Sequence, residues 1–280
     1  MSTAYSEVVE TARSYYNSDD ADNFYFHVWG GEDIHIGIYT AADEPIADAS
    51  RRTVERMASL AKSLGPDSRV LDLGSGYGGA ARYLARTFGC RVTALNLSEA
   101  ENERNRRMSR EQGLDPLIEV VDGSFEEVPA ADASFDLVWS QDAILHSGHR
   151  NRVIAEAARV LRPGGELVFT DPMQADDCPE GVLQPVLDRI HLSSLGSIGF
   201  YREQAAGQGL REVEVIEMTD QLVTHYSRVH DELIATRDAL AGKVSDAYIE
   251  RMLTGLNHWV EAGRNGYLRW GIMHFQKPSG

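Results

Sequence analysis

One acid and four glycines stand close together in the sequence, and their types and spacing point most directly to chemistry. Asp72 precedes Gly74, Gly76, Gly78 and Gly79. Glycine has no Cβ, so a ligand can approach the backbone closely, and a helix that starts after such a turn presents unbonded N–H groups. These residues therefore predict a binding site for a nucleotide-like ligand.

The residues on either side indicate the elements that must hold this turn. The apolar run 70–73 predicts a buried strand, and residues 80–86 predict a helix. In an open α/β sheet, such a strand and helix place the ligand at the carboxyl end of a parallel strand. The glycine spacing between residues 74 and 79 also fits a dinucleotide fingerprint, so a nucleotide-binding dehydrogenase is an alternative.

Three strings of residues resemble one superfamily. Val-Leu-Asp-Leu-Gly-Ser-Gly (70–76) resembles the first motif of class I S-adenosylmethionine-dependent methyltransferases, and Phe-Asp-Leu-Val (135–138) and Arg-Val-Leu-Arg-Pro-Gly-Gly (159–165) are typical of them too. The resemblance implies an α/β, Rossmann-like fold: a seven-stranded, mostly parallel sheet with helices on both faces and a helical lid insertion. It also implies S-adenosyl-L-methionine as the cofactor, held at its methionine part by the glycine turn and leaving as S-adenosyl-L-homocysteine.

The length of the chain limits its domain organisation, and its net charge limits the classes of binding partner. The 280 residues, 42% of them hydrophobic, predict a single methyltransferase domain over 1–280, with an N-terminal cap segment at 1–64 and a helical insertion or lid at 219–264. The net charge of −16, from 43 acids and 27 bases, disfavours nucleic acid and anionic membranes, so a small molecule should be the substrate. An arginine cluster interleaved with acids predicts a solvated helix face; its members are Arg104, Arg106, Arg107 and Arg110.

The cellular compartment is predicted from the sequence signals that direct proteins to secretion or to a membrane. The first residues carry no secretory signal and no apolar run approaches the length of a membrane span, so we expect a cytoplasmic protein. Cys90 and Cys178 lack metal-type spacing and are expected to be buried thiols rather than a disulfide. No metal site is expected.

Periodicity and turn residues predict the other elements. The predicted helices are 6–16, 47–64, 99–111 with Ser98 as N-cap, 151–161, 219–240 and 245–262. The predicted strands are 91–97, 117–121, 135–139, 166–171, 211–218 and 267–277, the last entering as a hairpin beside the one before it. Residues 172–200 contain several breakers and are expected to line the substrate side.

Residues at the ends of these strands are predicted to contact the cofactor. Asn96 lies about twenty residues beyond the glycines, where such sites usually carry an acid for the ribose hydroxyls, and an amide can still accept one of these bonds. By resemblance, Asp122 meets the adenine amino group; an ordinary turn carboxylate is the alternative. The predicted cofactor-binding residues are Tyr25, Ile36, Asp72, Gly74, Ser75, Gly76, Asn96, Leu97, Asp122, Gly123, Ser124, Phe125 and Gln141.

Further strings resemble the sarcosine/dimethylglycine N-methyltransferases, which make glycine betaine. They are Tyr-Tyr-Asn-Ser-Asp-Asp-Ala-Asp-Asn-Phe-Tyr (15–25), Trp-Gly-Gly-Glu-Asp-Ile-His-Ile-Gly-Ile-Tyr (29–39), Leu-Asn-Leu-Ser (95–98), Ser-Gln-Asp-Ala-Ile-Leu-His-Ser (140–147) and Tyr-Leu-Arg-Trp-Gly-Ile (267–272). The resemblance covers nearly the whole chain, and Asn96 agrees with it. It implies an enzyme of osmoprotectant synthesis that methylates dimethylglycine and also sarcosine.

A catalytic pair follows from a second resemblance. The related phosphoethanolamine methyltransferases carry arginine where Gln141 stands, and the missing arginine favours a carboxylate or neutral substrate over a phosphate. Their catalytic tyrosine and histidine correspond to Tyr16 or Tyr25 and to His146. A histidine with a near-neutral pKa could accept the proton of the substrate ammonium, directly or through water. The alternative is a core histidine that only hydrogen-bonds the tyrosine and clamps the lid.

The substrate itself predicts an aromatic wall, because aromatic faces attract the cation that a methylated amine becomes. The predicted substrate-binding residues are Tyr25, Trp29, Gln141, Tyr201 and Trp270, and each of the aromatic rings could equally be core. Arg189, Arg202 and Arg269 are candidates to bind a substrate carboxylate, and the sequence does not rank them. A methyltransferase of another small amine or hydroxyl is the second hypothesis; the preferred methylation step and the oligomeric state stay open.

Overall fold

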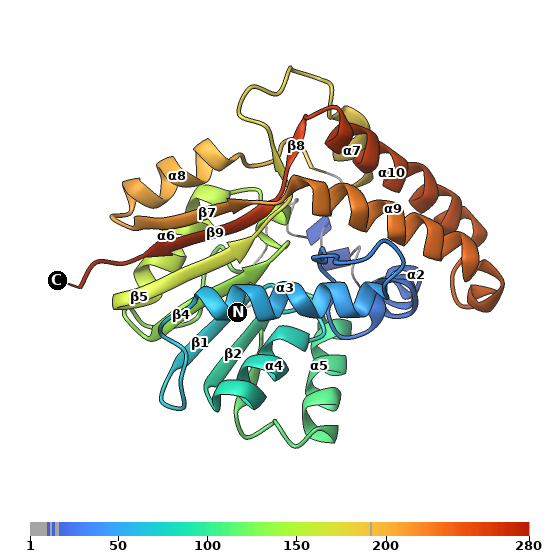
Figure 1. The fold of residues 1–280 in the computed structure, drawn as a ribbon. Coiled ribbons are helices and arrows are strands. Elements are labelled where there is room, and N and C mark those ends of the chain that lie inside the picture. Colours follow the sequence, from blue (N-terminus) through green and yellow to red (C-terminus); the bar gives the residue numbers. More distant parts are fainter. Residues whose placement is uncertain (1–9, 12, 15–16, 191, 280) are drawn as a thin grey trace.

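A seven-stranded sheet forms the centre of the molecule, a computed structural model that describes residues 10–11, 13–14, 17–190 and 192–279. The strand order is β3-β2-β1-β4-β5-β9-β7 (Figure 1). The strands are β1 (Arg69–Leu73), β2 (Arg91–Asn96), β3 (Ile118–Asp122), β4 (Phe135–Gln141), β5 (Leu161–Thr170), β7 (Arg211–Glu217) and β9 (Gly271–Gln276). All are parallel except β9, which runs antiparallel to both its neighbours, β5 and β7. The predicted seven-stranded, mostly parallel sheet is confirmed.

The last predicted strand, 267–277, differs from the prediction in two ways. It is split at Trp270, and its first part, β8 (Leu268–Arg269), pairs with β6 (Met173–Gln174) in a separate two-stranded sheet. The second part, β9, lies beside β7 as expected but also inserts between β7 and β5. Gly271 permits this insertion, because a Cβ there would overlap the carbonyl oxygen of Ile216 in β7.

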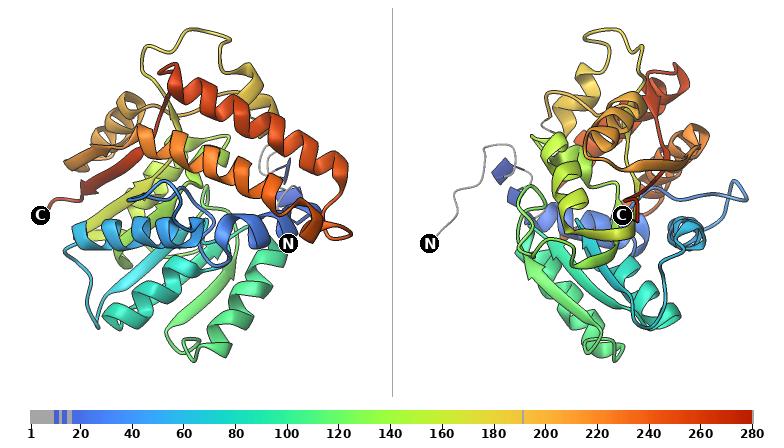
Figure 2. Two further views of the ribbon diagram at one scale, coloured as in Figure 1. Left: turned by 45° about the vertical axis from the view of Figure 1, so that its right-hand side comes forward. Right: turned by 90° about the vertical axis from the view of Figure 1, so that its left-hand side faces the viewer.

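Side chains of the central strands alternate between two apolar layers, which explains why these strands are continuous apolar runs. Val70 packs with α3 (Ile46–Leu60) and α4 (Gly79–Phe88), whereas Leu71 packs on the opposite face with α6 (Arg150–Val160) and α8 (Ile198–Gly207). The helix α5 (Glu99–Glu111) packs against β2 and β3. Helices therefore cover both faces of the sheet, as the two views in Figure 2 show.

A third apolar cluster lies beyond the carboxyl ends of the parallel strands. Its elements are α2 (Asp19–Phe24), the π-helix η1 (Tyr25–Gly30), α7 (Gln184–Arg189), α9 (Thr219–Ala235), the 3-10 helix η3 (Arg237–Leu240) and α10 (Asp246–Arg264). In α9 the buried Leu222, Tyr226, Val229 and Leu233 form one helical stripe, and α9 lies against α10 (Figure 1). The predicted segments 1–64 and 219–264 thus share a core above the sheet.

Local signals gave accurate bounds for several helices. Ser98 is the N-cap of α5 and accepts a hydrogen bond from the N–H of Glu101 at 3.2 Å, as predicted. The predicted helix 219–240 consists of α9 and η3, and 245–262 corresponds to α10. Most of the predicted helix 6–16 lies outside the described residues.

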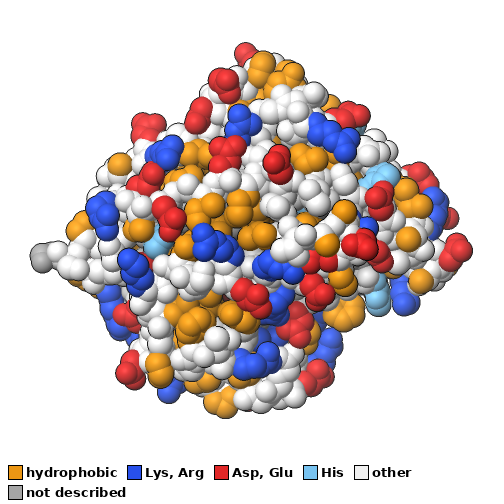
Figure 3. Space-filling view, in the orientation of Figure 1, with side chains coloured by type: hydrophobic (Ala, Val, Ile, Leu, Met, Phe, Trp, Pro, Cys, Tyr) orange, Lys and Arg blue, Asp and Glu red, His pale blue; other side chains and the backbone are white. Residues whose placement is uncertain are grey.

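The arginine cluster of α5 is less solvated than predicted. The guanidinium of Arg104 stacks over Phe26 at 4.3 Å and pairs with Asp22 in α2, and Arg106 pairs with Asp122 at 2.5 Å. These contacts tie the N-terminal segment and the end of β3 to α5. On the face drawn in Figure 3, acidic and basic side chains are interspersed, without a continuous track of one sign.

Two further expectations concern the compartment. None of the helices among the described residues is long and apolar enough to cross a membrane. Both cysteines are free thiols; Cys90 is buried, and Cys178 is only partly buried, which differs from the prediction. Cys178 lies in the irregular segment after β6 rather than in a packed strand, so no layer of side chains covers it fully.

Candidate active site

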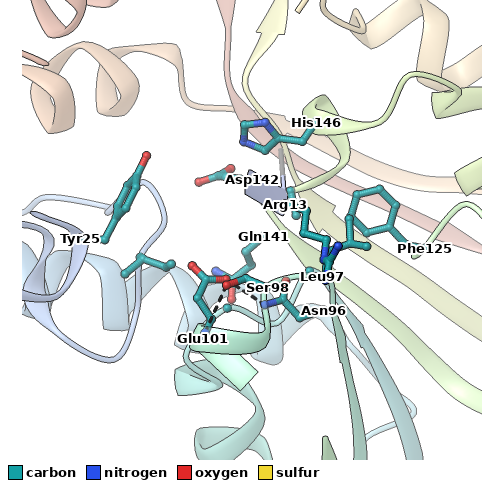
Figure 4. A pocket seen from close by; sticks show the side chains of 14 residues that line it. Arg13, Tyr25, Asn96, Leu97, Ser98, Glu101, Phe125, Gln141, Asp142 and His146 are labelled. Atoms are coloured by element: carbon teal, nitrogen blue, oxygen red, sulfur yellow. Dashed lines mark hydrogen bonds between the residues drawn. The ribbon is translucent and has the colours of Figure 1, made fainter. Parts of the chain in front are cut away.

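Three adjoining cavities open at the carboxyl ends of the parallel strands. The main cavity has a volume of about 690 Å³ and is lined by Arg13, Tyr25, Ile34, Gly74, Gly76, Asn96, Leu97, Ser98, Glu101, Phe125, Gln141, Asp142, Ala143 and His146. Figure 4 shows Tyr25 and Phe125 on opposite sides of it, with His146 and Asp142 at one end and Asn96 and Glu101 at the other. Eight predicted site residues therefore meet here: Tyr25, Gly74, Gly76, Asn96, Leu97, Phe125, Gln141 and His146.

Two smaller cavities continue from the main one. The glycine-side cavity, of about 320 Å³, shares Ile34, Gly74, Gly76 and Gln141 with it. The aromatic cavity, of about 440 Å³, shares Tyr25, Ile34, Asp142 and His146 with it. The predicted residues Asp72 and Ser75 line the glycine-side cavity, and Trp29 and Ile36 line the aromatic cavity.

The turn between β1 and α4 requires its glycines. Gly74, Gly76 and Gly78 have φ angles of +74°, +50° and +76°, a region that residues with a Cβ rarely adopt. A Cβ on Gly74 would also overlap the side chain of Ala143. No side chain caps the N-terminus of α4, so its first N–H groups stay available next to the cavity.

The glycine-side cavity gathers polar atoms that lack partners. Five buried atoms have no hydrogen-bond partner among the described residues: Asp33 Oδ1, His35 Nε2, Asp72 Oδ2, Ser75 Oγ and Gln141 Nε2. Burial is the main cause that raises the pKa of Asp72 to about 7, and the charge of the nearby Asp33 contributes to this rise. Asp33 Oδ1 and His35 Nε2 lie 3.7 Å apart and can pair with each other. Each group that stays unsatisfied costs about 1–3 kcal/mol, so the atoms of Asp72, Ser75 and Gln141 around one small cavity indicate a binding site. Their donors and acceptors suit a ligand that carries both an ammonium and a carboxylate group.

Asn96 is joined by an acid that the sequence analysis missed. Glu101, in the first turn of α5, is buried and accepts a hydrogen bond from Asn96 Nδ2 at 2.8 Å, and both line the main cavity (Figure 4). Burial raises the pKa of Glu101 to about 7. The pattern Ser98-x-x-Glu101 is typical of a capping box. This pattern accounts for Glu101 as part of a helix cap, so nothing in the sequence indicates that the acid also lines a cavity.

The residues after β3 divide into two groups. Phe125 lines the main cavity, whereas Asp122, Gly123 and Ser124 line none of the three cavities. The Asp122 carboxylate is half exposed and accepts hydrogen bonds from Asn102 Nδ2 at 2.8 Å and Arg106 Nη2 at 2.5 Å. In this structure Asp122 therefore has the contacts of the turn carboxylate that was the alternative, and its contact with adenine stays a prediction.

The aromatic cavity has a wall of four rings, two of them predicted. The ring centroids of Tyr25 and Trp29 are 5.2 Å apart, those of Trp29 and Tyr226 6.0 Å, and those of Tyr226 and Trp259 4.9 Å. All four side chains line the cavity. Tyr226 lies in α9 and Trp259 in α10, and each belongs to the apolar stripe of its helix. Nothing in the local sequence therefore distinguishes these two residues from the core residues of the same stripes.

Tyr201 and Trp270, which were predicted to touch the substrate, lie behind the site instead. Both are fully buried and line none of the three cavities. Tyr201 donates its O–H to Asp171 Oδ2 at 2.6 Å, and Trp270 donates Nε1–H to Asp142 Oδ1 at 2.8 Å. Their polar atoms are therefore used to hold two aspartates, while their rings fill the core.

Asp142 organises the junction of the main and aromatic cavities and was not singled out from the sequence. It follows β4 with an unusual φ of +50°. Its Oδ2 accepts a hydrogen bond from the backbone N–H of Ile36 at 2.7 Å, which joins the N-terminal segment to the sheet. Desolvation raises the pKa of the Asp142 carboxyl above its ordinary value.

His146 lies at the end of the 3-10 helix η2 (Ile144–His146) and lines both the main and the aromatic cavity. Burial lowers the pKa of its imidazole to about 4, and the charges of Arg189 and Arg150 lower it further. This value is below the near-neutral pKa expected from the sequence, so the ring is neutral at pH 7. Asp171 accepts the N–H of Leu145 at 3.0 Å and so fixes η2. Tyr16, the other predicted catalytic residue, lies outside the described residues.

The candidate metal ligands of the described residues are scattered over the fold. Among those residues, no group of three or more His, Cys, Asp or Glu side chains is arranged to hold a metal ion. The arrangement instead offers a glycine turn, a polar cavity for a zwitterion, and an aromatic cavity beside a neutral imidazole.

Known proteins similar to this chain agree with this arrangement. A family model described as "Methyltransferase domain" matches residues 71–169. The chain is 63% identical to a sarcosine/dimethylglycine N-methyltransferase of Halorhodospira halochloris, over 99% of this chain and 100% of that protein. It is 57% identical to the enzyme of the same name from Aphanothece halophytica, over 97% and 98%. A crystal structure of a protein from Galdieria sulphuraria, titled as a sarcosine dimethylglycine methyltransferase, superimposes with a TM-score of 0.90 at 46% identity and covers 95% of this chain and 100% of that one.

Proposed function

Because the chain belongs to the sarcosine/dimethylglycine N-methyltransferase family, we propose that it methylates the nitrogen of dimethylglycine, and of sarcosine, to form glycine betaine. The class I methyltransferase fold is the one that the sequence predicts. The observation that supports the substrate is the aromatic cavity, which joins the main cavity at Tyr25, Asp142 and His146. An amine in one cavity and a methyl donor in the other would meet at this junction.

The residues of the other two cavities fit S-adenosyl-L-methionine. The buried polar atoms of Asp72 and Ser75, which lack hydrogen-bond partners among the described residues, and the nearby pair of Asp33 and His35 match the donors and acceptors that its amino-acid end requires. Asn96 and Glu101 would accept hydrogen bonds from the ribose hydroxyls. The Glu101 carboxylate can accept two such bonds, whereas Asn96 alone accepts one. When bound, this cofactor supplies a methyl group on a sulfonium and leaves as the neutral thioether S-adenosyl-L-homocysteine.

The protein's own contribution begins with the charge on the substrate. Tyr25, Trp29, Tyr226 and Trp259 present aromatic rings to the amine, and such rings stabilise an ammonium that has left water. The product is a permanent cation, so the same wall also suits glycine betaine. Burying the amine in this cavity orders it against the junction and removes the water that would compete with it, which lowers the barrier to an in-line displacement.

The amine must lose its proton before its lone pair can attack. His146 lines the junction, and its imidazole is neutral at pH 7 because burial lowers its pKa to about 4. A neutral ring can accept the proton at a ring nitrogen, directly or through water, although as a weak base it must pass the proton on quickly. The hydrogen bond from Leu145 to Asp171 holds η2, and with it His146, in place.

The decisive experiment is mass spectrometry of the products formed with glycine, sarcosine, dimethylglycine and phosphoethanolamine. We expect betaine from dimethylglycine, and dimethylglycine and betaine from sarcosine. Gly74→Ala is the control, because its new Cβ would overlap Ala143 at a φ of +74° and should distort the glycine turn, so we expect it to form no product. Transfer to phosphoethanolamine alone would show that the substrate is wrong, a result that Gln141 in place of an arginine argues against.

A dehydrogenase is the alternative from another class, and a binding measurement separates the two. The thermal unfolding temperature should rise with S-adenosyl-L-homocysteine and stay unchanged with NAD, since a ligand that binds only the folded state stabilises it. A rise with NAD alone would overturn the proposal.

A further inference from the structure

The structure ranks the three arginines that the sequence left equal. Arg202 forms a two-bond ion pair with Glu212, at 2.8 and 3.0 Å, and its side chain is half exposed. Arg269 donates to the carbonyl oxygens of Gly266 and Leu268, at 2.7 and 2.8 Å. Neither lines the aromatic cavity, whereas Arg189, the last residue of α7, does.

The helix α10 has a slot that receives Arg189. A Cβ on Gly255 would overlap Arg189 Cδ and would lie only 2.9 Å from its Nε. One turn earlier on the same face, Met252 Sδ lies 3.5 Å from Arg189 Nη2. Glycine at position 255 therefore lets the arginine lie against the helix and brings its guanidinium to the cavity.

The same face of α10 places a second hydrogen-bond donor at the aromatic cavity. Trp259 stands one turn beyond Gly255, lines the aromatic cavity and is only 1% exposed. Its Nε1–H is buried with no hydrogen-bond partner among the described residues. A buried N–H without an acceptor costs about 1–3 kcal/mol, and an acceptor on a bound ligand would remove this cost.

Together these groups assign a ligand chemistry. We propose that Arg189 and the indole N–H of Trp259 bind the carboxylate of the substrate, and so select amino acids over amines that lack a carboxylate. This proposal rests on the proposed function and adds the orientation of the substrate. The carboxylate lies toward α10, and the amine lies toward His146 at the junction with the main cavity. Because the chain has a net charge of −16, a local cation favours the binding of an anionic group at this place.

The test compares two substrates that differ only in the group recognised. Dimethylglycine and N,N-dimethylethanolamine share the amine, and the second has a hydroxymethyl group where the first has the carboxylate. Arg189→Met should raise the KM for dimethylglycine about 100-fold and abolish the preference for it over N,N-dimethylethanolamine, because charge-assisted hydrogen bonds are lost. Trp259→Phe, which keeps a ring and removes the N–H, should raise that KM about tenfold. Arg202→Met is the matched control and should change it less than twofold.

A binding measurement gives a readout apart from turnover. Calorimetric titration of glycine betaine into the protein saturated with S-adenosyl-L-homocysteine should show the same losses of affinity, with the affinity for S-adenosyl-L-homocysteine itself unchanged. Arg189→Lys keeps the charge but loses the two-pronged geometry, and we expect about a tenfold weaker betaine affinity. If Arg189→Met fails to fold, the Arg189→Lys variant decides whether Arg189 binds the carboxylate.

The outcomes separate the two proposals. A wild-type protein that ignores dimethylglycine contradicts the proposed function. A wild-type protein that methylates dimethylglycine, with betaine affinity unchanged in Arg189→Lys and Trp259→Phe, leaves the function intact and overturns this assignment. An equal loss in Arg202→Met would overturn it as well, because that arginine does not line the cavity.

Discussion

Glu101→Gln is the substitution whose effect the structure defines most closely. The Glu101 carboxyl is buried beside the main cavity, and burial raises its pKa to about 7. Glutamine has the same shape as the protonated acid, but it offers one acceptor oxygen and no charge. The variant therefore asks whether the ribose hydroxyls bind an ionised carboxylate at this position.

The magnitude follows from proton linkage. Hydroxyl groups that donate to a carboxylate favour its ionised form, so cofactor binding should lower the pKa of Glu101 from its value of about 7. At pH 6 the substrate-free protein holds the proton and must release it on binding; at pH 8 the group is already ionised. If the bound carboxyl stays ionised at both pH values, the affinity through Glu101 is about tenfold higher at pH 8 than at pH 6, or about 1.4 kcal/mol.

The assay is calorimetric titration of S-adenosyl-L-homocysteine at both pH values. We expect Glu101→Gln to weaken binding about tenfold at pH 8 and no more than about twofold at pH 6. Comparing variant with wild type at each pH cancels the titration of Asp72. Glu111→Gln, an exposed position on the same helix, is the control and should change nothing at either pH. An equal penalty at both pH values, or a larger one at pH 6, would refute the assignment of Glu101 to the ribose.

Three more variants test other parts of the site. Asp72→Asn should stabilise the substrate-free protein at pH 8 by about 1–4 kcal/mol. The reason is that the stability contributed by the protonated carboxyl is lost as the pH rises through about 7, whereas an amide has no such loss. The affinity of this variant for S-adenosyl-L-homocysteine should fall at least tenfold. Scanning calorimetry with and without the ligand checks both, and a lower unfolding temperature at pH 8 would contradict the first. His146→Ala should lower kcat about 100-fold with unchanged S-adenosyl-L-homocysteine affinity, and steady-state rates that match wild type would leave His146 a structural residue. Tyr201→Phe removes the hydrogen bond to Asp171 and should lower the unfolding temperature by about 2–6 °C; no change would mean that this bond contributes nothing net.

Local sequence was sufficient for the sheet and the glycine turn. An apolar run, a glycine series and a helical pattern each report on residues that are neighbours in the chain, so β1, its turn and α4 follow from residues 69–88 alone. The same holds for the helix α5 and its N-cap Ser98. The pairing of β9 with β7 was expected, but its insertion between β5 and β7 did not follow, since hydrogen bonds to both strands depend on segments more than fifty residues away.

What the sequence determined by itself is the glycine turn between β1 and α4 and the methyltransferase superfamily to which the chain belongs. What only the tertiary structure decided is which side chains complete the site: Tyr226 and Trp259 rather than Tyr201 and Trp270 form the aromatic wall, and Arg189 rather than Arg202 reaches it. The reason is physical. Helical spacing states which residues share one face of α9 or α10, but whether that face meets a cavity or a packed core depends on how the helices lie on the rest of the fold.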